Sequence, residues 1–156
     1  MGDNAALLLL GALGLLLVSA GVEDARTRNI ANWKNGAITL LAPCWWWAIA
    51  LPLWPGAAVQ VVLALLVFAF FAAAFFLGQM GGGDVKLIAA LALWLPPTPL
   101  LWTLIVMSLV GGAVTVAMLL ETRWYQKGRA IEVPYGVAIA IAGLLTLREP
   151  IFNQFG

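Results

Sequence analysis

The sequence contains no histidine and a single cysteine, Cys44. Without histidine, the Ser-His and Cys-His pairs of common hydrolases are excluded. Zinc sites built from histidine and cysteine are excluded as well, and one cysteine cannot form a disulfide within the chain. Any acid–base chemistry must therefore be carried by aspartate, glutamate, lysine or tyrosine side chains.

Charged residues are also scarce. Only 10% of the 156 residues are charged, whereas 63% are hydrophobic, and the mean hydropathy is +1.00. A soluble domain has about 25% charged residues. This composition predicts one membrane domain covering residues 1–156. The net charge of +1 gives no reason to expect a nucleic-acid partner, and we expect neither a metal nor a cofactor.

Long apolar runs predict an all-α, polytopic membrane helix bundle with about six transmembrane helices. Asp3, rather than a basic residue, precedes the first run, so we expect a retained membrane helix and not a signal peptide. The fourth run is short, at about 16 Å of helix against a hydrocarbon core of ~30 Å. The predicted segments are Ala5–Val22, Trp33–Trp54, Ala57–Leu77, Val85–Leu95, Leu100–Leu120 and Val133–Leu147.

The basic residues are distributed unevenly among the loops of this arrangement. Seven of the eight fall on one side of the predicted membrane, and the loops on the other side carry no charge. The positive-inside rule makes the charged side cytoplasmic, so both termini are expected to be extracytoplasmic. The seven residues are Arg26, Arg28, Lys34, Lys86, Arg123, Lys127 and Arg129.

Three consecutive glycines and an acid, Gly81 to Asp84, interrupt the apolar sequence between the third and fourth segments. Glycine permits a positive φ and the close approach of another backbone. One interpretation is a tight turn in which Asp84 is the N-cap of the next helix. The other is a functional loop below the membrane surface, because ionisable groups at that depth are costly and usually functional. For Lys86, a snorkelling lysine is favoured over a contact with substrate.

Two of the seven acids, Asp24 and Asp84, fall on the same predicted side, each at the cytoplasmic end of a segment. Two facing aspartates can share a proton, so that one acts as general base on water and the other as general acid. Such a pair hydrolyses a peptide bond without histidine, serine or metal. The alternative for Asp24 is a helix-terminal cap paired with Arg26 or Arg28.

Three stretches resemble motifs of the type IV prepilin peptidases. Gly81 to Asp84 fits G-x-G-D, and the sequence up to Leu87 resembles their second active-site motif. The stretch Asp24–Asn32 resembles their first motif, with Ala31 where the family often has proline. The stretch Val133–Ala138 is similar to a recurrent element before their last span.

The resemblance implies a GxGD-type intramembrane aspartyl protease of the bacterial inner membrane. Such an enzyme removes the basic leader of prepilins at the cytoplasmic face, and the chain resembles the short form that serves Flp or Tad pili. By resemblance, Asp24 and Asp84 match the catalytic aspartates. Gly81, Gly83 and Lys86 match loop-shaping or substrate-binding positions. The implied partners are a prepilin-like substrate and membrane lipid.

Two other classes of protein fit the same composition. A small transporter or a pilus-assembly subunit would use Asp24 and Asp84 as ion or proton ligands. A transporter usually has two related halves with matching broken helices, and the halves of this sequence do not resemble each other. A purely structural assembly protein would depend on neither aspartate.

Overall fold

A computed structural model describes the backbone of residues 2–125 and 134–155, and side chains within 4–120 and 134–148. Within these residues the protein consists of helices joined by short connections. A single π-helical turn, η1 (Leu53–Ala57), leads into α3. The α-helices are α1 (Gly2–Thr27), α2 (Asn32–Ala48), α3 (Ala58–Phe76), α4 (Gly82–Ala92), α5 (Pro97–Tyr125) and α6 (Tyr135–Phe155).

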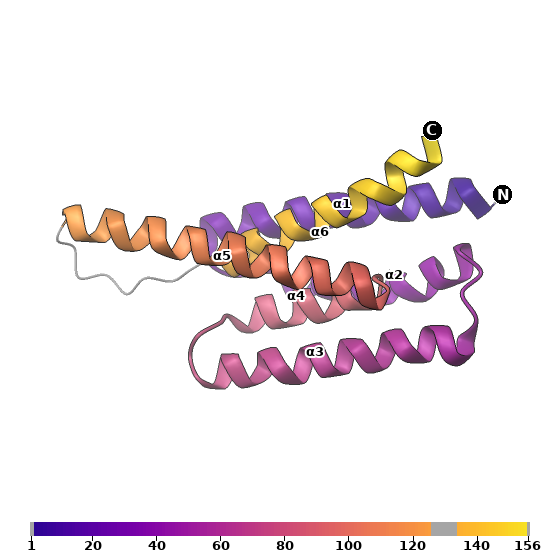
Figure 1. Ribbon diagram of the computed structural model, residues 1–156, viewed down its shortest axis with the longest axis horizontal. Helices are drawn as coiled ribbons and strands as arrows, with labels where there is room; N and C mark the ends of the chain where they lie inside the picture. The colour runs from indigo at the N-terminus through magenta and orange to yellow at the C-terminus, as the bar shows by residue number, and fades with distance from the viewer. Residues whose placement is uncertain (1, 126–133, 156) are drawn as a thin grey trace.

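The helices run roughly along one axis, and the short helix α4 lies in the middle of the view in Figure 1. Helix α1 packs mainly against α6, and α5 packs against the other side of α6. Helix α4 contacts α2, α3 and α6. Helix α3 lies at the edge of the bundle, where its main partners are α4 and η1.

The inner face of α1 follows from the spacing of its buried residues. Leu13, Leu17, Ala20 and Asp24 are all buried, and they recur at intervals of three or four residues. This spacing places them on one stripe of a helix with 3.6 residues per turn. The stripe faces α6, where Gly21 lies opposite Ala140. Asp24 therefore continues the apolar contact face of α1 instead of pointing outward.

Two tryptophans tie α2 to the end of α4. The Nε1–H of Trp94 donates to the carbonyl oxygen of Ile38 at 2.9 Å, and that of Trp46 donates to the carbonyl oxygen of Leu93 at 2.8 Å. Trp94 also stacks on Trp45, with ring centroids 5.7 Å apart. In Figure 1 the two termini and the α2–α3 connection lie at the same end of the bundle. The α4–α5 connection does not reach that end.

Three stretches are long and apolar enough to cross a membrane: Asn4–Thr27, Leu53–Phe76 and Pro97–Leu120. The apolar part of α6, Tyr135–Arg148, is shorter. With eleven residues, α4 confirms the prediction of a short fourth segment. The protein is thus an all-helical membrane protein in its described part. The number of spans and the location of the termini remain predictions.

Several predicted boundaries were wrong. Helix α1 continues five residues beyond Val22, so Asp24 lies within a helix. Helix α2 ends at Ala48 and not at Trp54, because Ala50 adopts a positive φ of 52° ahead of Pro52. Helix α5 extends to Tyr125, where a loop was expected after Leu120. Lys127, Arg129, Glu132 and Val133 lie outside the described residues.

Candidate active site

Asp24 lies in the last turns of α1, on the face that contacts α6, and its side chain is only 3% exposed. Its Oδ2 atom accepts a hydrogen bond from the backbone N–H of Val137 at 3.3 Å, and the N–H of Gly136 is a second partner. These amides belong to the first turn of α6, where N–H groups lack the regular helical partner four residues back, and the N–H of Val137 is shared with the carbonyl oxygen of Pro134 at 3.2 Å. Asp24 thus caps α6 and not its own helix. Arg28 is close enough to act on the carboxyl electrostatically.

Asp84 lies in the first turn of α4 and is 5% exposed. The N-cap of this helix is Gly81, so the prediction that Asp84 is the N-cap was wrong. The carboxyl instead reaches back to the N–H of Gly81, as the third residue of a helix does in a capping box. Gly82 and Gly83 are helical residues of this turn, so the expected non-helical loop is limited to the residues before them.

The glycines of this turn are required for close approach and not for a positive φ. Among the described glycines only Gly78 has a positive φ, of 71°. A Cβ on Gly81 would lie 3.0 Å from Oδ2 of Asp84. A Cβ on Gly83 would lie 3.2 Å from Cβ and 3.3 Å from the backbone nitrogen of Ile30. A side chain at Gly83 would therefore push α4 away from the α1–α2 connection.

Ile30 and Gly136 are part of the site, although no individual role was predicted for either residue. Ile30 is buried between the first turns of α4 and α6. A Cβ on Gly136 would lie 2.8 Å from Cδ1 of Ile30 and 2.8 Å from Oδ2 of Asp24. Real Cβ atoms essentially never approach so closely. The absence of a side chain at Gly136 is what allows α6 to bring its amides onto Asp24.

The two aspartates are brought together at this point. The N–H of Gly136 is a hydrogen-bond partner of both carboxyls. Asp84 lies outside the three candidate spans, and burial followed by the negative charge of Asp24 raises its pKa to about 7. Two carboxyls that interact in this way cannot both ionise easily.

An ion pair fixes the connection that carries Ile30. Nζ of Lys34 lies 2.9 Å from Oε2 of Glu23 and donates to the carbonyl oxygen of Ser19 at 3.0 Å. The same Glu23 oxygen accepts the backbone N–H of Ala31 at 3.1 Å. A proline at position 31 would lack this N–H. The prepilin peptidases often have proline at this position of their first motif. Because this chain has alanine there, its N–H can form the hydrogen bond that holds the α1–α2 connection to α1.

Lys86 is not part of the carboxyl cluster. Its Nζ donates to Oδ1 of Asn32 at 2.9 Å, and the side chain is exposed. Two residues along a helix turn the side chain by about 200°, so Lys86 faces away from Asp84. It borders a separate cavity between α2, α3 and α4.

Within the described residues, Asp24 and Asp84 belong to no group of three or more acids, histidines or cysteines that could hold a metal ion.

Comparison with known proteins identifies the family of the chain. Residues 10–116, more than half of the chain, match the model of the type IV leader peptidase family. The matched region contains both Asp24 and Asp84 and ends before α6. No curated protein and no solved structure matched the chain. The chain belongs to the type IV leader peptidase family.

Proposed function

We propose that the protein is a membrane-embedded aspartyl endopeptidase that removes the short basic leader from prepilin-like substrates. Family membership makes it a leader-peptidase-like protease of the membrane. The observation that carries the finer proposal is the pair of buried carboxyls, Asp24 and Asp84, that share the amide of Gly136. The chain contains no histidine that could serve as an alternative base.

In the proposed reaction, the ionised carboxylate of the pair takes a proton from water as the water oxygen attacks the scissile carbonyl carbon. The protonated carboxyl donates its proton to the carbonyl oxygen, which gives a neutral gem-diol. The diol then collapses: the C–N bond breaks, the protonated carboxyl gives its proton to the leaving nitrogen, and the ionised carboxylate takes a proton from one diol hydroxyl, which leaves a carboxylic acid and a pair with one proton. The amides of Gly136 and Val137 stabilise the carboxylate that is ionised at each stage.

The pH dependence of cleavage should be bell-shaped. Asp84 keeps its proton up to a pKa of about 7, so cleavage should fall as the pH rises through about 7 and the pair loses its last proton. Cleavage should also fall in acid, where both carboxyls are protonated and no base remains. The measurement is kcat/KM of the purified protein in detergent between pH 4 and pH 9. The two apparent pKa values of this profile belong to the pair and not to either residue. A rate that rises throughout this range would contradict a shared proton.

We propose further that the carboxyl pair faces the cytoplasm from the bacterial inner membrane. Support comes from Arg26, Arg28 and Lys34, which surround the α1–α2 connection, because basic residues favour the cytoplasmic side. In a Cys44→Ser background, Arg28→Cys should resist a membrane-impermeant thiol reagent in intact cells, and Trp54→Cys should react. Both side chains are exposed, so access alone does not separate them. Labelling of position 28 from outside would overturn this orientation.

The direct test is incubation of the purified protein with a prepilin-like peptide, followed by N-terminal sequencing of the product. The probe is a synthetic peptide with a lysine-containing leader, one glycine and then an apolar helix of about 20 residues, long enough to span the bilayer. We expect one cleavage next to the glycine, because a small residue leaves its carbonyl accessible. If the peptide stays intact while Asp24 and Asp84 prove essential for ion movement into vesicles, the ion-ligand alternative replaces the protease.

A further inference from the structure

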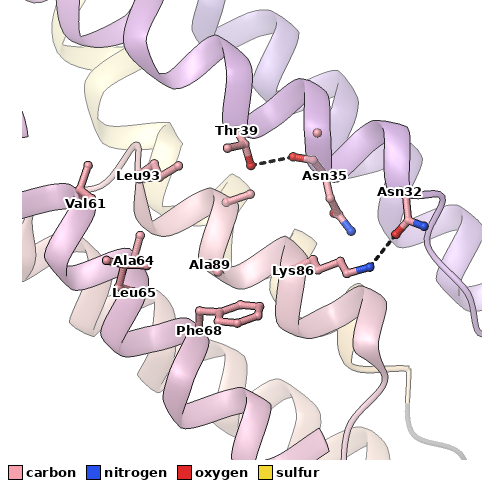
Figure 2. Close-up of a pocket in the computed structure, with 12 residues that line it drawn as sticks. Asn32, Asn35, Thr39, Val61, Ala64, Leu65, Phe68, Lys86, Ala89 and Leu93 are labelled. Carbon is pink, nitrogen blue, oxygen red and sulfur yellow. Dashed lines mark hydrogen bonds between the residues drawn. The ribbon is translucent and has the colours of Figure 1, made fainter.

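A cavity of about 480 Å³ opens between α2, α3 and α4, on the face of α4 that carries Lys86 and is turned away from Asp84 (Figure 2). One wall carries polar side chains. Asn32, Asn35 and Thr39 line it together with Gly36, on one stripe of α2. Oδ1 of Asn32 already accepts from Lys86, and the hydroxyl of Thr39 donates to the carbonyl oxygen of Asn35. Polar side chains in a membrane protein are costly and usually have a partner, so Asn35 is the side chain of this wall that calls for one.

The opposite wall is apolar. Val61, Ala64, Leu65 and Phe68 form the corresponding stripe on α3 (Figure 2). Leu65 is 62% exposed in the protein alone, and Phe68 is also exposed. The cavity therefore offers hydrogen-bonding groups on one side and apolar surface on the other. A lipid acyl chain would use only the apolar side. An extended peptide uses both, because its backbone needs hydrogen bonds and its side chains alternate in direction.

Asn35 connects the cavity to the carboxyl pair. It is 4% exposed, and its Nδ2 donates to the carbonyl oxygen of Gly83 at 3.2 Å, next to Asp84 in the chain. Its Oδ1 atom is buried without a hydrogen-bond partner. A buried acceptor without a partner is destabilising unless an occupant supplies a donor. The backbone N–H of a peptide entering the cavity is a donor of the required kind.

We propose that this cavity, the α2–α3 groove, binds an unwound stretch of the substrate polypeptide a few residues from the scissile bond. A backbone N–H of this stretch pairs with Oδ1 of Asn35 on the α2 wall, and its apolar side chains contact the α3 wall. The polar stripe from Asn32 to Thr39 spans about 10 Å along its helix, which matches about three extended residues. The inference rests on the proposed function, because it assigns a binding site to the same reaction.

Gly36 offers a test that spares the fold. A Cβ at this position meets no atom within 4 Å, and Gly36 lines the groove. Leucine at position 36 should therefore occupy the groove without displacing the protein, and it favours the helix more than glycine does. Gly112 on α5 is the matched control, since a Cβ there also meets nothing within 4 Å and it does not line the groove.

We expect Gly36→Leu to raise KM for the synthetic peptide by at least about tenfold with little change in kcat, since it removes binding and not chemistry. Gly112→Leu should keep both constants. The two controls are the unsubstituted protein and Gly112→Leu. If both cleave the peptide and the KM of Gly36→Leu is unchanged, the groove proposal is overturned, whereas the proposed function stands. If neither control cleaves, the proposed function is overturned and the groove with it.

A second measurement does not depend on turnover. A photo-crosslinking amino acid at Leu65, in an Asp84→Asn background, should capture the synthetic peptide in detergent micelles that contain phospholipid. The same group at Leu109, an exposed position of α5, should capture only lipid or detergent. Capture of lipid alone at both positions would overturn the assignment of the groove to a peptide.

Discussion

Replacement of either aspartate by asparagine is expected to reduce cleavage of the prepilin-like peptide by at least about 10²-fold, the usual contribution of a positioned acid or base. In Asp24→Asn, the amide oxygen can still accept from Val137 and Gly136, but it cannot take a proton from water. In Asp84→Asn, the group that holds the proton of the pair is lost. The measurement is kcat/KM of each purified variant with the unsubstituted protein beside it.

Glu23→Gln is the matched control for these substitutions. Glu23 is the neighbour of Asp24, and the change is also from a carboxylate to an amide. Its partner is Lys34 at 2.9 Å, and the oxygen of a glutamine can still accept the N–H of Ala31, so the α1–α2 connection keeps this hydrogen bond. Glu23→Gln should keep cleavage within a few-fold. Near-normal cleavage by Asp24→Asn or Asp84→Asn, with the variant folded by circular dichroism, would remove the aspartate pair from the mechanism.

The helical class and the candidate acids could be predicted from the sequence because both depend on local or compositional signals. Apolar runs indicate membrane helices, and the scarcity of acids left few candidates for chemistry. The inward direction of Asp24 was also accessible, since it continues the stripe of Leu13, Leu17 and Ala20 at helical spacing. The first segment was predicted to end at Val22, where hydropathy falls, although the helix continues through its polar end to Thr27.

The rest of the site depends on contacts between segments far apart in the chain. The hydrogen bond from Val137 to Asp24 joins residues 113 positions apart, and no local pattern encodes it. Gly81 to Gly83 were interpreted as a loop because glycine has a low helix propensity. That propensity matters little in a first turn, where the absence of Cβ lets Gly83 approach Ile30 and leaves room for Asp84 beside Gly81.

Gly136→Ala is expected to reduce kcat by about 10²-fold, the effect of displacing a catalytic group by roughly 1 Å. The new Cβ would lie 2.8 Å from Oδ2 and 2.9 Å from Cβ of Asp24, and 2.8 Å from Cδ1 of Ile30. Since Cβ of Asp24 is fixed to the backbone of α1, the first turn of α6 must move away. The amide of Gly136 would then withdraw from both carboxyls.

This displacement has a signature that loss of stability alone does not produce. The Gly136 amide lowers the pKa of Asp84, so its withdrawal should shift the alkaline limb of the pH profile to higher pH. Gly143→Ala is the control for packing, because its Cβ would lie 3.0 Å from Cδ1 of Leu17, between the same two helices but about two turns along α6 from Gly136. It should lower the melting temperature and leave the alkaline limb in place. If Gly143→Ala shifts the limb as Gly136→Ala does, or if Gly136→Ala keeps the kcat and pH profile of the unsubstituted protein, then α6 supports the aspartates only through packing.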